Sequence, residues 1–229
     1  MITIVERSQP RIAVNALAQY LIAPAGRRHR IIVEQKRPKT FQVNYYDPAT
    51  DAICEFLAGQ IGHEELLSHR RGVIGAPVTK EWGLRRNESC GEAIRAVANA
   101  RPDSGLAGLV VKRAKRRPPK MVIGSVLVSV RPELFLVRKR EDGRVERGYL
   151  KLYFSKNAPL TQQLGKYIAA IVHQYAEMRL AERGGCDREL CRVLDVFTGN
   201  AFIAPIAIKR NRADIAEACR EIGAMWRHV

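Results

Sequence analysis

The amino-acid sequence predicts a mixed fold of helices and strands, of the α+β or α/β class. Apolar residues recur at helical spacing through much of the N-terminal half. From Met121 onward the composition shifts to short runs of branched and aromatic residues, which favour strands. A long stretch with helical spacing follows these runs. The expected order is therefore helices, three strands, a long helix, a strand and a closing helix.

The N-terminal part is expected to be mainly helical. Residues 11–22 place apolar side chains on one face, and a Pro-Ala-Gly sequence then ends this helix. A second helix is expected over residues 47–57. The spacing of Ser89 and Glu92 is that of a capping box, which predicts a helix beginning at Ser89. Residues 62–86 show little periodicity and predict no definite element.

Three strands are expected in the middle of the chain. Their residues alternate or are rich in valine, leucine and aromatic side chains, as in strands that are half buried. The Glu-Asp-Gly sequence at 141–143 is a strong hairpin-turn signal between the second and third strands. The three strands are expected at residues 122–130, 134–137 and 149–154.

The C-terminal part returns to helical spacing. Pro159 is expected to start a long helix, because proline suits the first helical turn and apolar residues recur at helical spacing from Leu160 to Met178. A strand is expected at 192–197 and resumes at 202–208. A closing helix is expected from about Arg212 onward.

These elements divide the chain into three parts. Residues 1–110 form a mainly helical region that packs on the core, and residues 121–229 form the α/β core. Residues 111–120 are expected to be an exposed basic loop, because cations crowd a short stretch that contains two consecutive prolines. The cations of this stretch are Lys112, Arg113, Lys115, Arg116, Arg117 and Lys120.

The charge balance points to a polyanionic partner. Lysine and arginine number 39 against 23 acidic residues, which gives a formal net charge of +16. Phosphate groups release counterions when they bind such a protein, so nucleic acid is the expected partner. Hydrophobic residues make up 46% of the chain, so the charge does not indicate a disordered protein. The candidate nucleic-acid-binding residues are Arg27, Arg28, Arg30, Lys36 and Arg37 in one group, and Lys112, Arg113, Lys115, Arg116 and Arg117 in another.

Aromatic residues stand close to the first basic group in the sequence. They are Phe41, Tyr45 and Tyr46. Cations beside aromatic rings suit a track on which phosphates are bound and bases stack. The alternative is a solvated basic face whose aromatic rings turn to the core. No helix-turn-helix, zinc finger or RNA-recognition signature is present, so sequence-specific reading of bases is not predicted.

The sequence predicts a cytoplasmic protein that makes no contact with a membrane. Its start lacks a basic region followed by an apolar one, and no run reaches the ~18 apolar residues that span a bilayer. Five cysteines without a Cys-x-x-Cys pair favour reduced thiols. They are Cys54, Cys90, Cys186, Cys191 and Cys219.

Two local motifs resemble those of the PD-(D/E)XK nuclease superfamily. Pro132-Glu133, followed by Lys151 on a later strand, is similar to the motif that names the superfamily. Gln163-Leu-Gly-Lys-Tyr167 resembles the Gln-hydrophobic-x-x-Tyr signature of the RecB-like branch, in the helix after the third strand. This resemblance implies a restriction-endonuclease-like core in the order helix, three strands, helix, strand.

The N-terminal sequence resembles the opening of the same branch. Residues 15–20, then Pro24 and two arginines, are similar to a short helix followed by a Cys-Pro-x-Arg type turn. Ala23 stands where the iron–sulfur members carry cysteine, so no cluster is expected.

The resemblance also implies a catalytic site. Glu133 would be a ligand of Mg²⁺ or Mn²⁺, and Lys151 would orient or activate the attacking water. Gln163 and Tyr167 lie four residues apart on a helix and would act on the same substrate. The sequence departs from the motif at Tyr149, two residues before Lys151, where the family carries the second carboxylate.

This departure sets the functional expectation. The protein is expected to bind nucleic acid, DNA in preference to RNA, on a RecB-like nuclease scaffold with an incomplete catalytic motif. It would act with a protein partner in DNA processing or in defence against foreign DNA. An alternative is an active metal-dependent nuclease with a relocated second carboxylate, for which Glu92 is a candidate and the orientation of Glu146 is open. A further alternative is a protein–protein scaffold whose basic surface meets an acidic partner.

Overall fold

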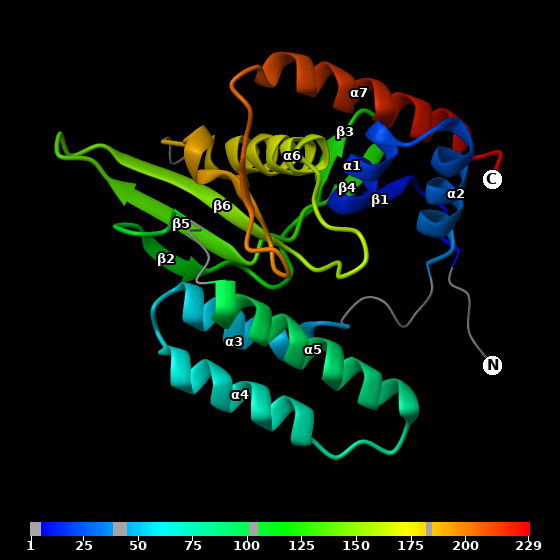
Figure 1. The fold of residues 1–229 in the computed structure, drawn as a ribbon. Helices are drawn as coiled ribbons and strands as arrows, with labels where there is room; N and C mark the ends of the chain where they lie inside the picture. The colour runs from blue at the N-terminus through cyan, green and yellow to red at the C-terminus, as the bar shows by residue number, and fades with distance from the viewer. Residues whose placement is uncertain (1–5, 39–44, 101–104, 182–184) are drawn as a thin grey trace.

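The computed structural model describes residues 6–38, 45–100, 105–181 and 185–229 and confirms a mixed α+β fold. Figure 1 shows a long sheet that lies between two layers of helices. The helix α6 covers one face of this sheet, and α3 with α5 covers the other. A smaller sheet lies beside α6. No helix in the described ranges is both long enough and apolar enough to cross a membrane.

The larger sheet has five strands and carries the candidate site. The strand order is β2-β5-β6-β7-β8. All neighbours are antiparallel except β6 and β7, which are parallel and are connected through α6 (Gln162–Leu180). A parallel pair needs such a crossover, so the long helix is a consequence of this pairing. The strands are β2 (Val110–Arg113), β5 (Leu134–Lys139), β6 (Val145–Tyr153), β7 (Arg192–Asp195) and β8 (Ala201–Ile203).

The smaller sheet has three strands in the order β1-β4-β3. In it β1 (Arg11–Ala13) pairs in parallel with β4 (Val126–Ser129), which turns from β3 (Met121–Ile123) through a glycine. This glycine, Gly124, has a φ of 58°, a conformation that suits glycine in a tight turn. The single strand expected at 122–130 is therefore a hairpin of two short strands.

The N-terminal helices divide between the two faces of the larger sheet. The first two, α1 (Val14–Ile22) and α2 (Ala25–Lys36), join the hydrophobic cluster around α6 and the closing helix α7 (Ile208–Met225). The next three form the opposite cluster, which contains leucines of β5 and β6. They are α3 (Asp47–Leu57), α4 (His63–Gly75) and α5 (Glu81–Ala100).

Two helix starts differ from the prediction. The helix α5 begins at Glu81, so Ser89 lies within it, where its hydroxyl donates to the Arg85 carbonyl at 2.8 Å. The long helix begins at Gln162 and not at Pro159, because Thr161 caps it by accepting from a main-chain amide.

Four further segments differ from the prediction or were not predicted. Residues 111–113 belong to β2, so the basic loop expected over 111–120 begins as a strand. Two helices were not predicted, α2 and α4. The closing helix starts at Ile208, earlier than expected.

Candidate nucleic-acid interface

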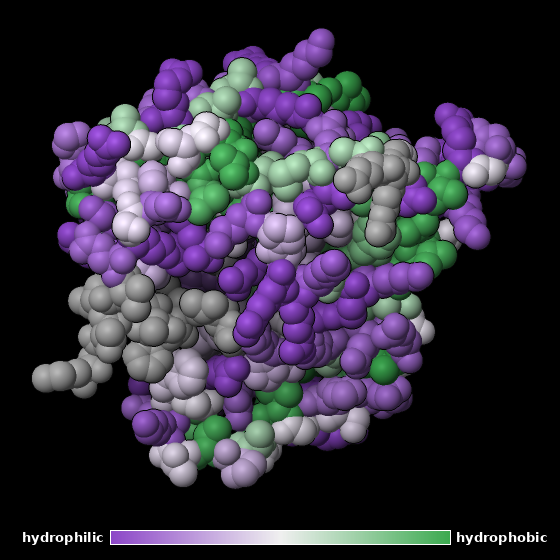
Figure 2. Space-filling view, turned by 180° about the vertical axis from the view of Figure 1, so that it is seen from behind, coloured by the Kyte–Doolittle hydropathy of each residue, from purple (hydrophilic) through white to green (hydrophobic). Residues whose placement is uncertain are grey.

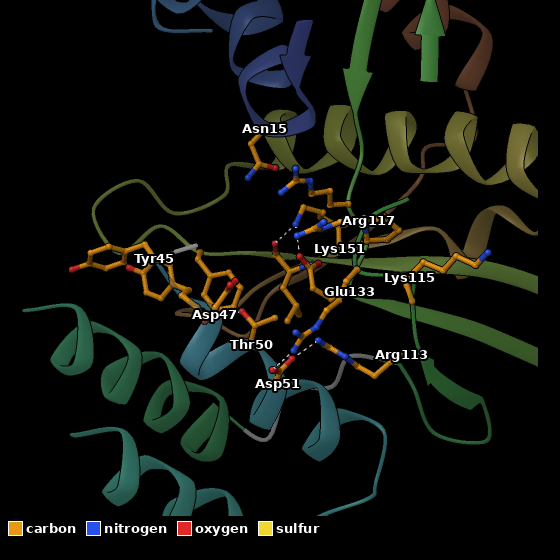
Figure 3. Close-up of a pocket in the computed structure, with 17 residues that line it drawn as sticks. Asn15, Tyr45, Asp47, Thr50, Asp51, Arg113, Lys115, Arg117, Glu133 and Lys151 are labelled. Atoms are coloured by element: carbon orange, nitrogen blue, oxygen red, sulfur yellow. Dashed lines mark hydrogen bonds and ion pairs between the residues drawn. The ribbon is translucent and has the colours of Figure 1, made fainter. Parts of the chain in front are cut away.

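A polar pocket of ≈ 740 Å³ opens at one end of the larger sheet. Figure 3 shows Asn15 on its α1 side, Thr50 and Asp51 on the α3 side, and Glu133 with Lys151 between them. Several elements far apart in the sequence therefore meet here. The lining residues are Asn15, Tyr45, Tyr46, Asp47, Thr50, Asp51, Arg113, Ala114, Lys115, Arg116, Arg117, Arg131, Pro132, Glu133, Lys151, Leu152 and Phe154.

Glu133 and Lys151 form an ion pair in this pocket. Lys151 Nζ donates to Glu133 Oε1 at 2.7 Å and to the Leu152 carbonyl at 3.1 Å. The other carboxylate oxygen, Oε2, accepts from the Leu152 main-chain amide at 2.6 Å. The two side chains are 15% and 11% exposed. The antiparallel register of β5 and β6 brings these two predicted residues together, because Glu133 directly precedes the pair Leu134–Leu150.

The position of the missing second carboxylate is filled by an aromatic ring. Tyr149 packs against Phe135 and Tyr175, with ring centroids 5.3 Å and 5.7 Å away. Glu146 does not replace that carboxylate, because it is bound by Arg138 at 2.6 Å near the hairpin end of β6 and does not line the pocket.

The pocket also contains two acids from a helix, in addition to Glu133, which directly precedes β5. Asp47 and Asp51 both come from α3, one helical turn apart. Asp51 accepts from Arg113 at 2.5 Å and from Arg116 at 2.6 Å. Within the part of the chain that the structure describes, no three His, Cys, Asp or Glu residues are grouped so that they could hold a metal ion. The residues present therefore do not form a ready Mg²⁺ site around Glu133.

The segment after β2 brings positive charge to the pocket. The Ala114 amide donates to the Glu133 carbonyl at 2.9 Å, which aligns this segment with the start of β5. Arg113 and Arg116 share the single carboxylate of Asp51, whereas Lys115, Arg117 and the neighbouring Arg131 have no acidic partner among the described residues. Figure 2 shows hydrophilic side chains in a band between the upper part of the molecule and the lower helices.

Aromatic rings form another wall of the pocket. Tyr46 stacks on Phe154 with a centroid distance of 4.7 Å and an interplanar angle of 15°. Tyr45 contacts the edge of Tyr46 at 5.1 Å. Burial raises the pKa of Tyr46. This wall places the rings near Lys115, Arg117 and Arg131, whereas the sequence predicted them beside the basic residues of 27–37. Phe41 lies outside the described residues.

Two polar atoms of pocket residues are buried without a hydrogen-bond partner. They are Asn15 Oδ1 and Arg113 Nη1. Burying a polar atom without a partner costs free energy, on the order of 1–3 kcal/mol. One atom accepts and the other donates, so a polar ligand could satisfy both.

Three residues predicted to be catalytic lie elsewhere. Gln163 is exposed on α6, and the Tyr167 hydroxyl donates to Asp214 Oδ2 at 2.9 Å. Glu92 on α5 pairs with Lys156 at 2.8 Å. None of the three lines the pocket, so the structure does not join them to the pair of Glu133 and Lys151.

The basic residues of α2 also lie outside the pocket. Arg27 pairs with Glu34 at 2.8 Å, and the Arg28 guanidinium lies over the ring of Tyr20. Arg30 is exposed. Arg28 also lies 3.6 Å from Glu221, so two of the three arginines pair with acids.

Lys36 and Arg37, the last two residues of this basic group, contact residues near the two ends of the chain. Lys36 Nζ donates to the Val229 carbonyl at 2.6 Å and to that of Trp226 at 3.2 Å. Arg37 pairs with Glu6 at 3.4 Å. The prediction that Lys36 contacts phosphate is therefore at odds with its contacts, because its side chain is 13% exposed and its ammonium group binds the C-terminal segment.

Among the lining residues, Asn15, Asp47, Asp51, Arg131 and Phe154 were not identified from the sequence. Asn15 lies in the first turn of α1, Asp47 and Asp51 lie in α3, Phe154 follows β6, and Arg131 directly precedes the Pro132-Glu133 motif. The position of Arg131 beside that motif was the one local signal. Asn15 and Asp51 are recognised only when the elements are assembled.

Comparison of the sequence with known proteins finds no matching family model and no significantly similar curated protein. The function must therefore be inferred from the geometry of the site.

Proposed function

We propose that this protein binds nucleic acid at the pocket around Glu133 and Lys151. The observation that carries this proposal is the combination of three unneutralised cations with a stacked pair of rings in one pocket. The cations would bind phosphates, and the rings would stack on unpaired bases. The cations are Lys115, Arg117 and Arg131, and the rings are those of Tyr46 and Phe154.

We further propose that the scaffold is restriction-endonuclease-like and of the RecB-like type. Two features support this. The consecutive elements β5, β6, α6 and β7 follow the strand, strand, helix, strand order of such a core, with β6 and β7 parallel. In addition, the acid and the lysine of the motif, Glu133 and Lys151, are in direct contact. This support concerns the scaffold and does not imply that the site is active.

The chemistry of the pocket favours binding over cleavage. Phosphodiester hydrolysis with Mg²⁺ or Mn²⁺ needs carboxylates that hold the metal and a group that orients water. Here Tyr149 replaces the second carboxylate, and both oxygens of Glu133 already accept hydrogen bonds. We therefore assign the protein a binding role, in DNA processing or in defence, with DNA preferred to RNA.

A working nuclease is the second candidate, and one observation favours it. Asp47 and Asp51 line the same pocket as Glu133, so α3 could supply the relocated carboxylate in place of Glu92. Asp51 would first have to exchange Arg113 and Arg116 for a metal ion.

Labelled single- and double-stranded DNA and RNA test these proposals together. Binding is measured by fluorescence anisotropy over a series of salt concentrations, and cleavage is measured with Mg²⁺, with Mn²⁺ and with a chelator. We expect binding that weakens steeply with salt, and no cleavage. Metal-dependent cleavage that is lost in Asp51→Asn and in Lys151→Met would instead establish the nuclease.

If the protein binds none of these nucleic acids in a salt-dependent manner, the proposed function is overturned. An acidic protein partner would then be the remaining explanation for the basic surface. A matched control is Arg71→Gln, which removes an exposed arginine of α4 outside the pocket. Its affinity should equal that of the unmodified protein.

A further inference from the structure

Three arginines gather beside the pocket, next to the smaller sheet. In the parallel pair of β1 and β4, Arg11 is opposite Leu127 and Ala13 is opposite Ser129. Side chains alternate between the two faces of a sheet along a strand. Leu127 and Ser129 therefore share the face of Arg11 and Ala13, and Arg131, two positions after Ser129, continues this face.

The third arginine, Arg7, is fixed next to this face by α2. Its amide donates to the Lys36 carbonyl at 2.9 Å, and its Nη1 donates to the Gln35 carbonyl at 2.9 Å. Burial, together with the charges of Arg11 and Arg131, lowers the pKa of Arg7. Burial and Arg131 lower the pKa of Arg11 in the same way. These electrostatic contributions agree with the register of β1 and β4, which places Arg11 and Arg131 on one face of the smaller sheet.

No acid neutralises these three arginines among the described residues. Glu6, which precedes Arg7, binds Lys36 and Arg37 instead, and Glu133, two residues after Arg131, pairs with Lys151. Guanidinium groups keep their charge at all physiological pH values, so the repulsion is not relieved by loss of a proton. An anion placed between them would relieve it. Planar guanidinium groups match the oxygens of a phosphate, with which they form paired hydrogen bonds.

We propose that Arg7, Arg11 and Arg131 form a phosphate-binding site that extends the nucleic-acid track beyond the pocket. Arg131 lines the pocket as well, so the two sites are continuous. A strand with a nucleotide in the pocket would place a following phosphate on these arginines. This inference rests on the proposed function, and it adds a direction in which the strand leaves the pocket, toward β1 and the C-terminal end of α2.

The length of the ligand separates the arginine site from the pocket. Affinity is measured for a dinucleotide, which is too short to occupy both sites fully, and for an oligonucleotide of about 12 nucleotides, within the range of single-strand binding sites. The variants are Arg131→Gln, Arg11→Gln and Arg11→Lys, and the control is Arg71→Gln. Arg131 is exposed, and circular dichroism verifies folding of the variants at the partly buried Arg11.

We expect Arg11→Gln to weaken binding of the long strand and to leave the dinucleotide unaffected. Both glutamine variants should lower the slope of log affinity against log salt by about 0.7–0.9, the contribution of one phosphate contact. Arg11→Lys should recover most of that slope, because it keeps the charge.

Each other outcome is decisive. If the unmodified protein binds the long strand with a steep salt dependence and the Arg11 and Arg131 variants keep that slope, the arginine site is wrong and the proposed function stands. If the unmodified protein binds no nucleic acid, both fail. If inorganic phosphate, titrated at constant ionic strength, binds the unmodified protein but not Arg11→Gln, while the long strand binds both equally, the arginines bind free phosphate and not a polynucleotide.

Discussion

The ion pair of Glu133 and Lys151 is both the centre of the candidate site and a buried contact that stabilises the fold. Glu133→Ala leaves the ammonium group of Lys151 with a single carbonyl as partner. Removing one member of a buried pair costs about 3–5 kcal/mol of unfolding free energy. We therefore expect a loss of about 3 kcal/mol, measured by urea denaturation.

The double variant Glu133→Ala/Lys151→Met provides the control for this prediction. It removes the uncompensated charge and should therefore be more stable than Glu133→Ala alone. If the double variant is less stable than Glu133→Ala, the uncompensated charge of Lys151 is not the cause of the loss of stability in Glu133→Ala. The same data tell whether lost nucleic-acid binding reflects the site or the fold.

A reactive thiol is predicted at Cys186, remote from the pocket. Hydrogen bonds from the Cys191 thiol and from His173 lower the pKa of Cys186 to about 6. A thiol loses its proton as pH rises through its pKa, so the reactive thiolate predominates above about pH 6 here, compared with about pH 8.5 for a free cysteine. The rate of alkylation by iodoacetamide should rise between about pH 5 and 7 and then level off.

Mass spectrometry of the alkylated peptides measures this rate for each cysteine. Burial raises the pKa of Cys54 and Cys219 to about 12, so these thiols should remain unmodified in the folded protein. Cys186→Ser should abolish the fast reaction. A midpoint near pH 8.5 for Cys186 would contradict the prediction.

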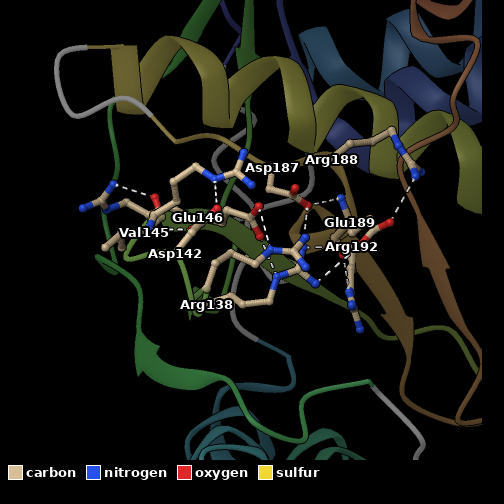
Figure 4. Close-up of polar contacts among 11 residues, drawn as sticks. Arg138, Asp142, Val145, Glu146, Asp187, Arg188, Glu189 and Arg192 are labelled. Carbon is tan, nitrogen blue, oxygen red and sulfur yellow. Dashed lines mark hydrogen bonds and ion pairs between the residues drawn. The ribbon is translucent and has the colours of Figure 1, made fainter.

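At the scale of elements, a salt-bridge network fastens the long β5–β6 hairpin to the segment before β7. Figure 4 shows Arg138 among three acids, Glu146 across the hairpin and Asp187 and Glu189 from the following segment. Arg138 Nε binds Glu146 at 2.6 Å, and its Nη2 lies 3.3 Å from Glu189 and 3.4 Å from Asp187. The Arg138 side chain is 21% exposed, so solvent screens these contacts only in part.

Arg138→Ala should therefore loosen the hairpin. We expect a loss of about 2 kcal/mol, since hydrogen bonds to charged groups are worth about 1.5–3 kcal/mol each but are partly compensated by water. Hydrogen exchange of the hairpin amides should become faster. Arg144→Ala is the matched control, because its ion pair with Asp142 is exposed in the turn and should change stability by less than about 0.5 kcal/mol. Equal effects of the two variants would argue against the network.

Two helical glycines are predicted to respond oppositely to alanine. A Cβ atom at Gly165 of α6 would overlap the ring of Phe202 of β8, whereas Gly72 of α4 has open space around it. Alanine favours a helix over glycine by about 1 kcal/mol. Gly72→Ala should therefore raise the unfolding free energy by up to that amount. Gly165→Ala should lower it by about 1–3 kcal/mol through overpacking, as measured by urea denaturation. A stabilised Gly165→Ala would mean that α6 can move away from β8.

Local sequence signals predicted some elements and misplaced others for identifiable reasons. The hairpin turn at 141–143 was predicted correctly because Gly143 has a φ of 82°, which its sequence favours. A Ser-x-x-Glu spacing also occurs inside helices, so Ser89 gave a false start within α5. The strand β2 was missed because an edge strand with exposed cations looks like a loop.

At the scale of the whole molecule, the pocket depends on pairing that the sequence does not reveal. The motif predicted that Glu133 and Lys151 meet, and the register of β5 and β6 explains why they do. Asn15 and Asp51 join them through packing of α1 and α3 on opposite faces of the sheet, which no local periodicity encodes. The distribution of charge between the pocket and the rest of the surface is likewise a tertiary property.

The net charge of +16 and the local charge of the pocket lead to different expectations for binding. Lys115→Glu/Arg117→Glu and Arg71→Glu/Arg95→Glu each exchange two cations for two acids, so both lower the net charge from +16 to +12. The first pair lines the pocket, and the second pair is exposed on α4 and α5. At about 0.15 M salt the screening length is about 8 Å, so distant charges contribute little to affinity.

We therefore expect the pocket variant to lose most of its affinity for single-stranded DNA, whereas the variant on α4 and α5 should keep it within a few-fold. Anisotropy titrations at one fixed salt concentration measure the difference. The direct phosphate contacts and the counterions that they release act only where the strand lies, which is why position should outweigh total charge. Equal losses in the two variants would show that binding follows net charge, and the pocket would then cease to be the candidate site.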